Sequence, residues 1–169
     1  MNQFLIDKEF ALRYERHFCE AMRENFTFWG SYYLPVLNAV NGNDFGVDII
    51  MESSNSLEKY FIDVKCYRKP KFIKSFSGVF IETYLPKSGR PGWFCDENKE
   101  TTHYIFAIDC CEDKVAYSKA WCISKDDLQR AVMRADRLGL LTYKSISTAI
   151  GFILPYEILD EMGAVIDVK

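Results

Sequence analysis

The chain has 169 residues and a mass of 19.7 kDa, with 49% hydrophobic and 27% charged residues. This length and composition predict a single folded domain over residues 1–169 and exclude a disordered chain. The longest apolar run, residues 149–154, is too short to span a membrane, and the first residues lack the features of an export signal, so we expect a cytoplasmic protein. A net charge of −3 argues against general electrostatic attraction to nucleic acid but permits a local basic patch.

The first predicted element is an amphipathic helix that runs from Asp7 to about residue 25. Aspartate commonly precedes a helix, so we expect Asp7 to be the N-cap. Apolar side chains recur at helical spacing along it: Phe10, Ala11, Tyr14, Phe18, Ala21 and Met22. Glu15 lies close to the middle of this apolar stripe, and it either reaches inward or is an ordinary glutamate at the boundary.

A β-hairpin is predicted after the segment 26–46, which is aromatic at first and then rich in Asn, Gly and Asp. Its strands are residues 47–52 and 59–67, joined by turn-forming residues. Further strands are predicted at 79–84, 103–109, 115–123, 148–154 and 165–168, and helices from Ser124 to near Gly139 and at 156–162. The strand at 115–123 is expected to pair with that at 103–109. This order predicts an α/β fold of the mixed α+β, layered kind.

Little in the sequence suits a zinc site or a disulfide framework. The six cysteines form no CxxC pair, and the two histidines, His17 and His103, belong to no cluster with ligand spacing. Oxygen ligands are therefore the alternative for a metal.

Charged residues on the hairpin carry the functional prediction. Side chains alternate along a strand, so Asp63 and Lys65 share one face. A symmetric hairpin gives three cross-strand pairs: Glu52–Lys59, Ile50–Phe61 and Asp48–Asp63. Two adjacent carboxylates repel each other, and a divalent cation that prefers oxygen ligands removes this repulsion. Mg²⁺ is the cation that we expect there.

Asp48 and the later Asp63-Val64-Lys65 resemble the PD-(D/E)XK nuclease superfamily. In that pattern an acid on one strand and the acid of a D-x-K element bind Mg²⁺. Gly46-Val47 occupies the place of the pattern's Pro-Asp pair, a variation that the superfamily often shows. The resemblance implies a restriction-endonuclease-like three-layer core with a central mixed β-sheet flanked by helices. It also implies an endonuclease that hydrolyses phosphodiester bonds in DNA, with Mg²⁺ or Mn²⁺ as its cofactor.

The same resemblance implies a role for each motif residue. Asp48 and Asp63 would hold the metal, with the Val64 carbonyl as a further ligand. Lys65 would position or activate the attacking water. The first helix of the superfamily often contributes a glutamate, for which Glu15 is the candidate.

One more carboxylate, Glu82, lies on a strand after the motif. It either adds an oxygen to the metal shell or faces solvent.

Context makes the hairpin motif specific. Acid-x-Lys also occurs at 97–99, 112–114 and 167–169, but only Asp63 lies within an apolar strand that follows an acid-bearing strand. The alternative is a surface hairpin on which Asp63 and Lys65 are solvated or weakly paired.

A basic cluster follows the motif directly and is the predicted nucleic-acid-binding segment: Arg68, Lys69, Lys71 and Lys74. Tyr67 and Trp93 could stack on bases. Because one domain carries one active site, double-strand cleavage would require a homodimer. Two other functions stay open: a catalytically silent nuclease-like module that binds nucleic acid or protein, and an unrelated α/β domain with an accidental motif.

Overall fold

The computed structural model describes residues 3–24, 33–37, 46–53, 57–68 and 77–166. Within them the elements, in chain order, are α1 (Gln3–Glu24), β1 (Tyr33–Leu37), β2 (Ile49–Ser53), β3 (Lys59–Arg68), β4 (Gly78–Leu85), β5 (Arg90–Pro91), β6 (His103–Cys110), β7 (Lys119–Ser124), α2 (Lys125–Arg137), β8 (Thr142–Ser145), β9 (Ile150–Pro155), α3 (Tyr156–Met162) and β10 (Ala164–Val165).

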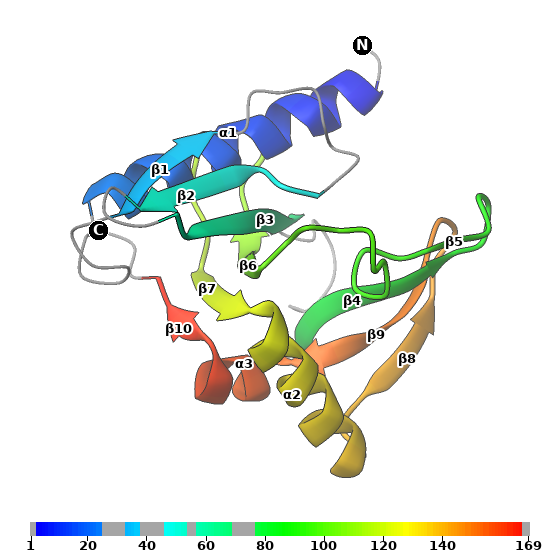
Figure 1. Cartoon of the computed structure of the whole chain (residues 1–169). Coiled ribbons are helices and arrows are strands. Elements are labelled where there is room, and N and C mark those ends of the chain that lie inside the picture. Colours follow the sequence, from blue (N-terminus) through cyan, green and yellow to red (C-terminus); the bar gives the residue numbers. More distant parts are fainter. Residues whose placement is uncertain (1–2, 25–32, 38–45, 54–56, 69–76, 167–169) are drawn as a thin grey trace.

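Six strands form a mixed sheet in the order β1-β2-β3-β6-β7-β10 (Figure 1). β3 and β6 run parallel, and the other neighbours in this sheet are antiparallel. The remaining four strands form an antiparallel sheet in the order β5-β4-β9-β8. The mixed α+β class that the sequence predicts is therefore confirmed.

Helix α1 covers one face of the mixed sheet (Figure 1). Its apolar stripe, with residues four apart on one side of the helix, packs on inward side chains of the strands. This first core contains Phe10, Tyr14, Phe18 and Met22 of α1, and Ile49, Met51, Ile62, Ile105, Ala107 and Ala120 of the strands.

The opposite face of the mixed sheet packs against the antiparallel sheet together with α2 and α3 (Figure 1). This second core includes Val79, Ile81, Tyr104, Phe106, Trp121, Ile123, Leu128, Leu154 and Leu159. Strand β6 serves both cores, because Ile105 faces α1 whereas Tyr104 and Phe106 face the antiparallel sheet. The result is a layered arrangement in which both faces of the mixed sheet are covered.

Several local predictions are confirmed. Helix α1 ends at Glu24, close to the expected end. β6 and β7 pair antiparallel, and Ser124 is the N-cap of α2, with its hydroxyl accepting from the Asp127 N–H at 3.0 Å. Helix α3 spans the expected residues 156–162.

Other local predictions are wrong. Asp7 is not an N-cap, because α1 begins at Gln3 and the Asp7 carboxylate instead accepts from Arg68 at 2.6 Å. The strand after β6 begins at Lys119 and not at residue 115, since the Ala116 backbone is bonded to Cys111 and to the Tyr14 hydroxyl. The last strand is Ala164–Val165 rather than 165–168, and 167–169 lie outside the described residues. Strand β8 and the separate antiparallel sheet were not expected.

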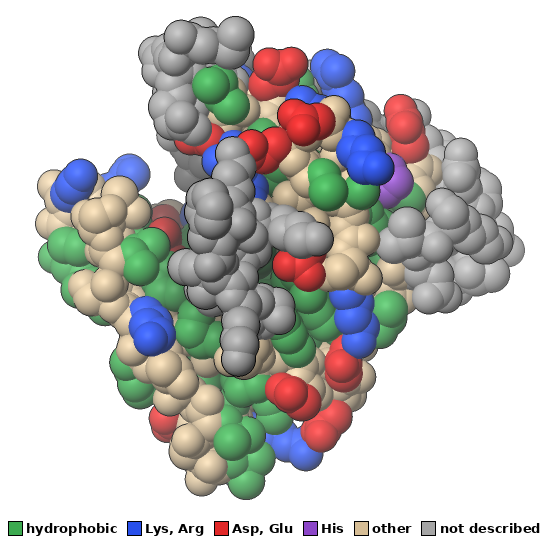
Figure 2. Space-filling view, turned by 180° about the vertical axis from the view of Figure 1, so that it is seen from behind, with side chains coloured by type: hydrophobic (Ala, Val, Ile, Leu, Met, Phe, Trp, Pro, Cys, Tyr) green, Lys and Arg blue, Asp and Glu red, His purple; other side chains and the backbone are tan. Residues whose placement is uncertain are grey.

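The surface carries mixed charge. On the face shown in Figure 2, acidic and basic side chains are interspersed over the upper part, and hydrophobic side chains gather lower down. Such a surface favours local electrostatic contacts over attraction by the molecule as a whole. Among the described helices, none combines the length and apolarity needed to cross a bilayer.

Candidate metal centre

The β2–β3 hairpin positions the motif as the sequence predicts. Ile50 pairs with Phe61 and Glu52 with Lys59, so these two expected pairs are confirmed. The expected Asp48–Asp63 pair is not part of the ladder, which ends at the Ile49–Ile62 pair. Asp48 lies just ahead of β2, and its N–H donates to the Ile62 carbonyl at 2.8 Å. Its carboxylate Oδ2 then accepts from the Val64 N–H at 2.7 Å. Asp48 is thereby fixed against the backbone that carries Asp63 and Lys65.

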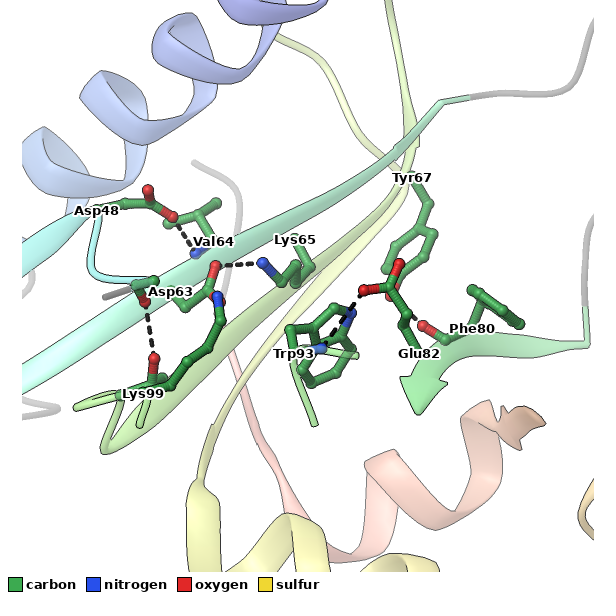
Figure 3. A network of polar contacts seen from close by, with 11 residues as sticks. Asp48, Asp63, Val64, Lys65, Tyr67, Phe80, Glu82, Trp93 and Lys99 are labelled. Carbon is green, nitrogen blue, oxygen red and sulfur yellow. Dashed lines mark hydrogen bonds and ion pairs between the residues drawn. The ribbon is translucent and has the colours of Figure 1, made fainter. Parts of the chain in front are cut away.

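Asp63 is the most buried charged group of the site. Its side chain is 2% exposed, and the Lys65 ammonium donates to its Oδ1 at 2.6 Å (Figure 3). Its Oδ2 has no hydrogen-bond partner among the described residues. The Nζ of Lys99 lies 3.9 Å from that oxygen, within ion-pair distance but beyond hydrogen-bond distance. One oxygen of this buried carboxylate is thus paired, and the other accepts no hydrogen bond from the part of the chain that the structure describes.

Two carboxylates beside Asp63 have raised pKa values. Burial, and then the charges of Asp63 and Glu15, raise the pKa of Asp48 to about 7. Burial and the charge of Asp63 likewise raise the pKa of Glu15. Glu15 is partly buried on α1, and it lies close enough to Asp63 for that charge to act on its pKa.

The pKa of Lys65 is raised as well. Burial alone would lower its pKa, but the charge and hydrogen bond of Asp63 and the charges of Asp48 and Glu82 raise it overall. Lys65 is therefore a stable ammonium ion at neutral pH.

A divalent cation fits the donor set. Mg²⁺ commonly takes one or two protein carboxylates and completes its shell with water and substrate oxygens. Asp48 and Asp63 supply two carboxylates, and the unbonded Oδ2 of Asp63 is a buried acceptor that a cation would satisfy. Within the described residues, no group of three or more His, Cys, Asp or Glu side chains is arranged to hold a metal. The fit to Mg²⁺ therefore rests on two carboxylate ligands, Asp48 and Asp63.

A cleft of about 570 Å³ opens beside Lys65. Its lining combines aromatic and charged side chains from α1, β3, β4 and the segment before β6, including Val64, Lys65, Tyr67, Arg68, Phe80, Glu82, Trp93 and Lys99. The Lys65 ammonium lies 5.4 Å from the centre of the Trp93 ring. Tyr67 donates through its hydroxyl to the Phe80 carbonyl at 2.7 Å, which holds β4 against β3.

Glu82 lies in this cleft and not among the carboxylates around Asp63. One of its oxygens accepts from the Trp93 N–H at 3.4 Å, and its charge contributes to the raised pKa of Lys65 (Figure 3). Glu82 is only partly exposed, so neither a purely solvent-facing role nor direct contact with Asp63 describes its position.

The predicted nucleic-acid-binding residues are placed only in part. Arg68 lines the cleft, but its guanidinium is already paired with Asp7 at 2.6 Å, lies 3.8 Å from Glu112, and stacks over the Phe10 ring at 4.4 Å. Lys69, Lys71 and Lys74 lie outside the described residues. Arg68 thus ties β3 to α1, whatever else it contacts.

Sequence reasoning missed Lys99, which it treated only as the end of an uninformative acid-x-Lys triplet. No local pattern could have selected it, because its place beside Asp63 depends on how the segment before β6 docks on the hairpin. Thr101 helps to fix that docking by donating its hydroxyl to the Gly46 carbonyl at 2.7 Å.

Comparison with protein-family models, with curated proteins and with solved structures finds no significant match to this chain.

Proposed function

We propose that the protein is a Mg²⁺-dependent endonuclease that hydrolyses phosphodiester bonds in DNA, with a restriction-endonuclease-like core of the PD-(D/E)XK kind. The observation that carries the proposal is the state of Asp63. It is a buried carboxylate with Lys65 on one oxygen and no hydrogen bond from the described residues on the other. Its charge also acts on two neighbouring carboxylates, because after burial it is the next cause of the raised pKa values of Asp48 and Glu15. Acids and a lysine in this order and proximity are what the superfamily resemblance calls for.

The chain's residues divide the work between binding and charge stabilisation. Asp48 and Asp63 would hold the cation, with the Val64 carbonyl as a further oxygen donor. Mg²⁺, when bound, neutralises charge on the phosphate and makes water more acidic. Lys65 keeps its proton, as its raised pKa favours, and its ammonium stabilises negative charge that grows on the phosphate in the transition state. No nucleophilic side chain is needed for this chemistry.

The cleft beside Lys65 supplies a route for the nucleic acid. Lys65 and Lys99 line it as cations, and Phe80, Tyr67 and Trp93 line it as aromatics. Phosphates bind cations, and bases stack on aromatic rings, so this lining suits a nucleotide chain better than an apolar ligand.

A plasmid assay tests the proposal. Purified protein with Mg²⁺ or Mn²⁺ should convert supercoiled plasmid to nicked or linear forms, and EDTA should prevent it. Asp63→Asn should lower the rate by about 10²-fold or more, because ligand charge is lost. Glu58→Gln, which removes an exposed carboxylate in the hairpin turn, is the matched control and should leave the rate unchanged.

Two results would contradict the proposal in different ways. Cation binding by calorimetry without cleavage of duplex or single-stranded DNA would favour a catalytically silent binding module. Neither cation binding nor cleavage would make the carboxylates a structural cluster.

A further inference from the structure

A second lysine shares Asp63 with the motif lysine. Lys99 comes from the segment between β5 and β6, and Figure 3 shows it and Lys65 approaching Asp63 from different directions. Lys65 donates to Oδ1 at 2.6 Å, whereas the Lys99 Nζ lies 3.9 Å from Oδ2. The Lys99 side chain is only 15% exposed. Two ammonium groups therefore face one buried carboxylate, Lys65 through a hydrogen bond and Lys99 through an ion pair without one.

Gly46 opens the path by which Lys99 reaches Asp63. A Cβ atom at position 46 would lie 2.3 Å from the Lys99 Nζ and 2.9 Å from its Cδ. Gly46 also has a φ of +65°, a conformation that favours glycine. The Thr101 hydroxyl, bonded to the Gly46 carbonyl, holds the segment in register with this gap. The position of Lys99 is thus specified by two residues besides itself.

A divalent cation bound at Asp63 would displace one of the two lysines more easily than the other. A cation at Oδ2 of Asp63 repels both ammonium groups, but Lys65 retains a direct hydrogen bond to Oδ1 and Lys99 has none to give up. Lys99 also lines the cleft, so its flexible stem can carry the ammonium from the carboxylate to the cleft. Phosphate oxygens in the cleft would offer the expelled ammonium a new partner.

We propose that Lys99 is a substrate-phosphate-binding residue that rests on Asp63 in the metal-free protein and turns into the cleft when a divalent cation binds. The inference rests on the proposed cation site, and it adds a coupling between cation and nucleic acid. The cation frees Lys99 for the phosphate, and phosphate binding keeps Lys99 away from the cation's ligand, so each tightens the other.

Calorimetric titration with Mg²⁺, without DNA, tests whether Lys99 rests on Asp63 in the metal-free protein. Lys99→Met keeps the stem and removes the charge, so Mg²⁺ should bind this variant about 3- to 10-fold more tightly than wild type because no ammonium competes. Lys59→Met is the matched control. It removes one exposed lysine, paired with Glu52 on the same hairpin, and should leave Mg²⁺ affinity unchanged.

Fluorescence anisotropy of a short duplex oligonucleotide measures DNA binding and tests the position of Lys99 in the cleft. With Ca²⁺, which supports binding without demanding cleavage, Lys99→Met should weaken affinity several-fold and reduce the slope of log affinity against log salt by about 0.9. With EDTA the variant and wild type should have the same slope, since Lys99 then stays on Asp63.

Each result bears on the inference. Equal or weaker Mg²⁺ binding by Lys99→Met overturns the inference alone, and so does a loss of DNA affinity that is the same with Ca²⁺ and with EDTA. No Mg²⁺ binding by wild type overturns the inference together with the proposed function. If Lys99→Met does not fold, Lys99→Gln provides the same two readings.

Discussion

The two oxygens of Asp63 have different surroundings, and in the proposed nuclease this difference would separate metal binding from catalysis at the motif. Oδ1 is bonded to Lys65, and Oδ2 has no hydrogen bond among the described residues. A cation can therefore use Asp63 without displacing Lys65, which leaves the lysine free to act on the substrate.

Replacing Lys65 with Met should lower single-turnover DNA cleavage by about 10²-fold or more, because the ammonium that stabilises transition-state charge is lost. Mg²⁺ affinity should not fall, since no ligand is removed. Cleavage kinetics beside a calorimetric titration on the same sample give both readings. Lys87→Met, in the exposed turn after β4, is the control. Cleavage within a few-fold of wild type would remove Lys65 from the reaction.

Asp48 gives the metal-free protein a characteristic pH dependence. Its pKa of about 7 in the folded protein is above its ordinary value of 3.8, so the folded state holds the proton more tightly than the unfolded state. The resulting stabilisation is complete below pH 4 and is lost as the pH rises through 7. Asp48→Asn removes this dependence.

Thermal unfolding in EDTA at pH 5 and pH 8 should therefore show a smaller loss of stability with rising pH in Asp48→Asn than in wild type. The difference should be on the order of 2 kcal/mol, since one pKa unit corresponds to about 1.4 kcal/mol and the shift is shared among coupled carboxylates. Glu52→Gln, at the other end of β2, should leave the wild-type profile intact. Parallel profiles for Asp48→Asn and wild type would mean that the Asp48 pKa is not raised.

Among the elements, α1 is fastened to the sheet by more than its apolar stripe. The Tyr14 side chain is fully buried, and its hydroxyl lies 2.8 Å from the Ala116 carbonyl oxygen and accepts from the Ala116 N–H at 3.2 Å. This bond links the middle of the helix to the turn between β6 and β7.

Tyr14→Phe should lower the free energy of unfolding by about 1–2 kcal/mol, because the part-buried Ala116 N–H loses the hydroxyl to which it donates. Urea denaturation measures the change. Tyr117→Phe is the comparison, since its hydroxyl bonds the side chain of His17 at 3.3 Å and leaves no backbone group unsatisfied. Equal losses in the two variants would show that the hydrogen bonds of Tyr14 to the turn add no more to the free energy of unfolding than the bond of Tyr117 does.

How far sequence predicts an element here depends on the range of the contacts that define it. The hairpin register followed from a short turn and alternating side chains, and the α2 cap followed from Ser124 and Asp127. Strand β8 could not be predicted in this way, because all four of its residues are exposed and none alternates with a buried neighbour. The start of α1 was misplaced because Asp7, a typical capping residue, is used instead by Arg68, 61 residues away.

The whole molecule is organised around β6, whose alternate side chains enter the two cores. Ile105→Ala opens the core beneath α1, and Phe106→Ala opens the core beneath the antiparallel sheet. We expect losses of about 2–5 and 3–5 kcal/mol respectively.

In both variants, tryptophan fluorescence and far-ultraviolet circular dichroism should follow one coincident unfolding transition, because a strand shared by two cores cannot leave only one of them. Separate transitions in Ile105→Ala, with the antiparallel sheet still folded, would contradict this.

The site itself was predictable only where it is local. Asp48, Asp63 and Lys65 lie on one hairpin, so strand geometry alone brought them together. Lys99 and the cleft depend on a second sheet and on the docking of the segment before β6, and neither leaves a periodic signal in the sequence.

The bond between Thr101 and Gly46 joins residues 55 positions apart in the chain, and it has a consequence for folding kinetics. Closing so long a loop is slow relative to forming the hairpin, so we expect the surroundings of Asp63 to be completed after the main folding barrier. A ligand that recognises only the completed surroundings stabilises the native state without stabilising the transition state. Mg²⁺ should therefore slow unfolding while leaving the refolding rate almost unchanged.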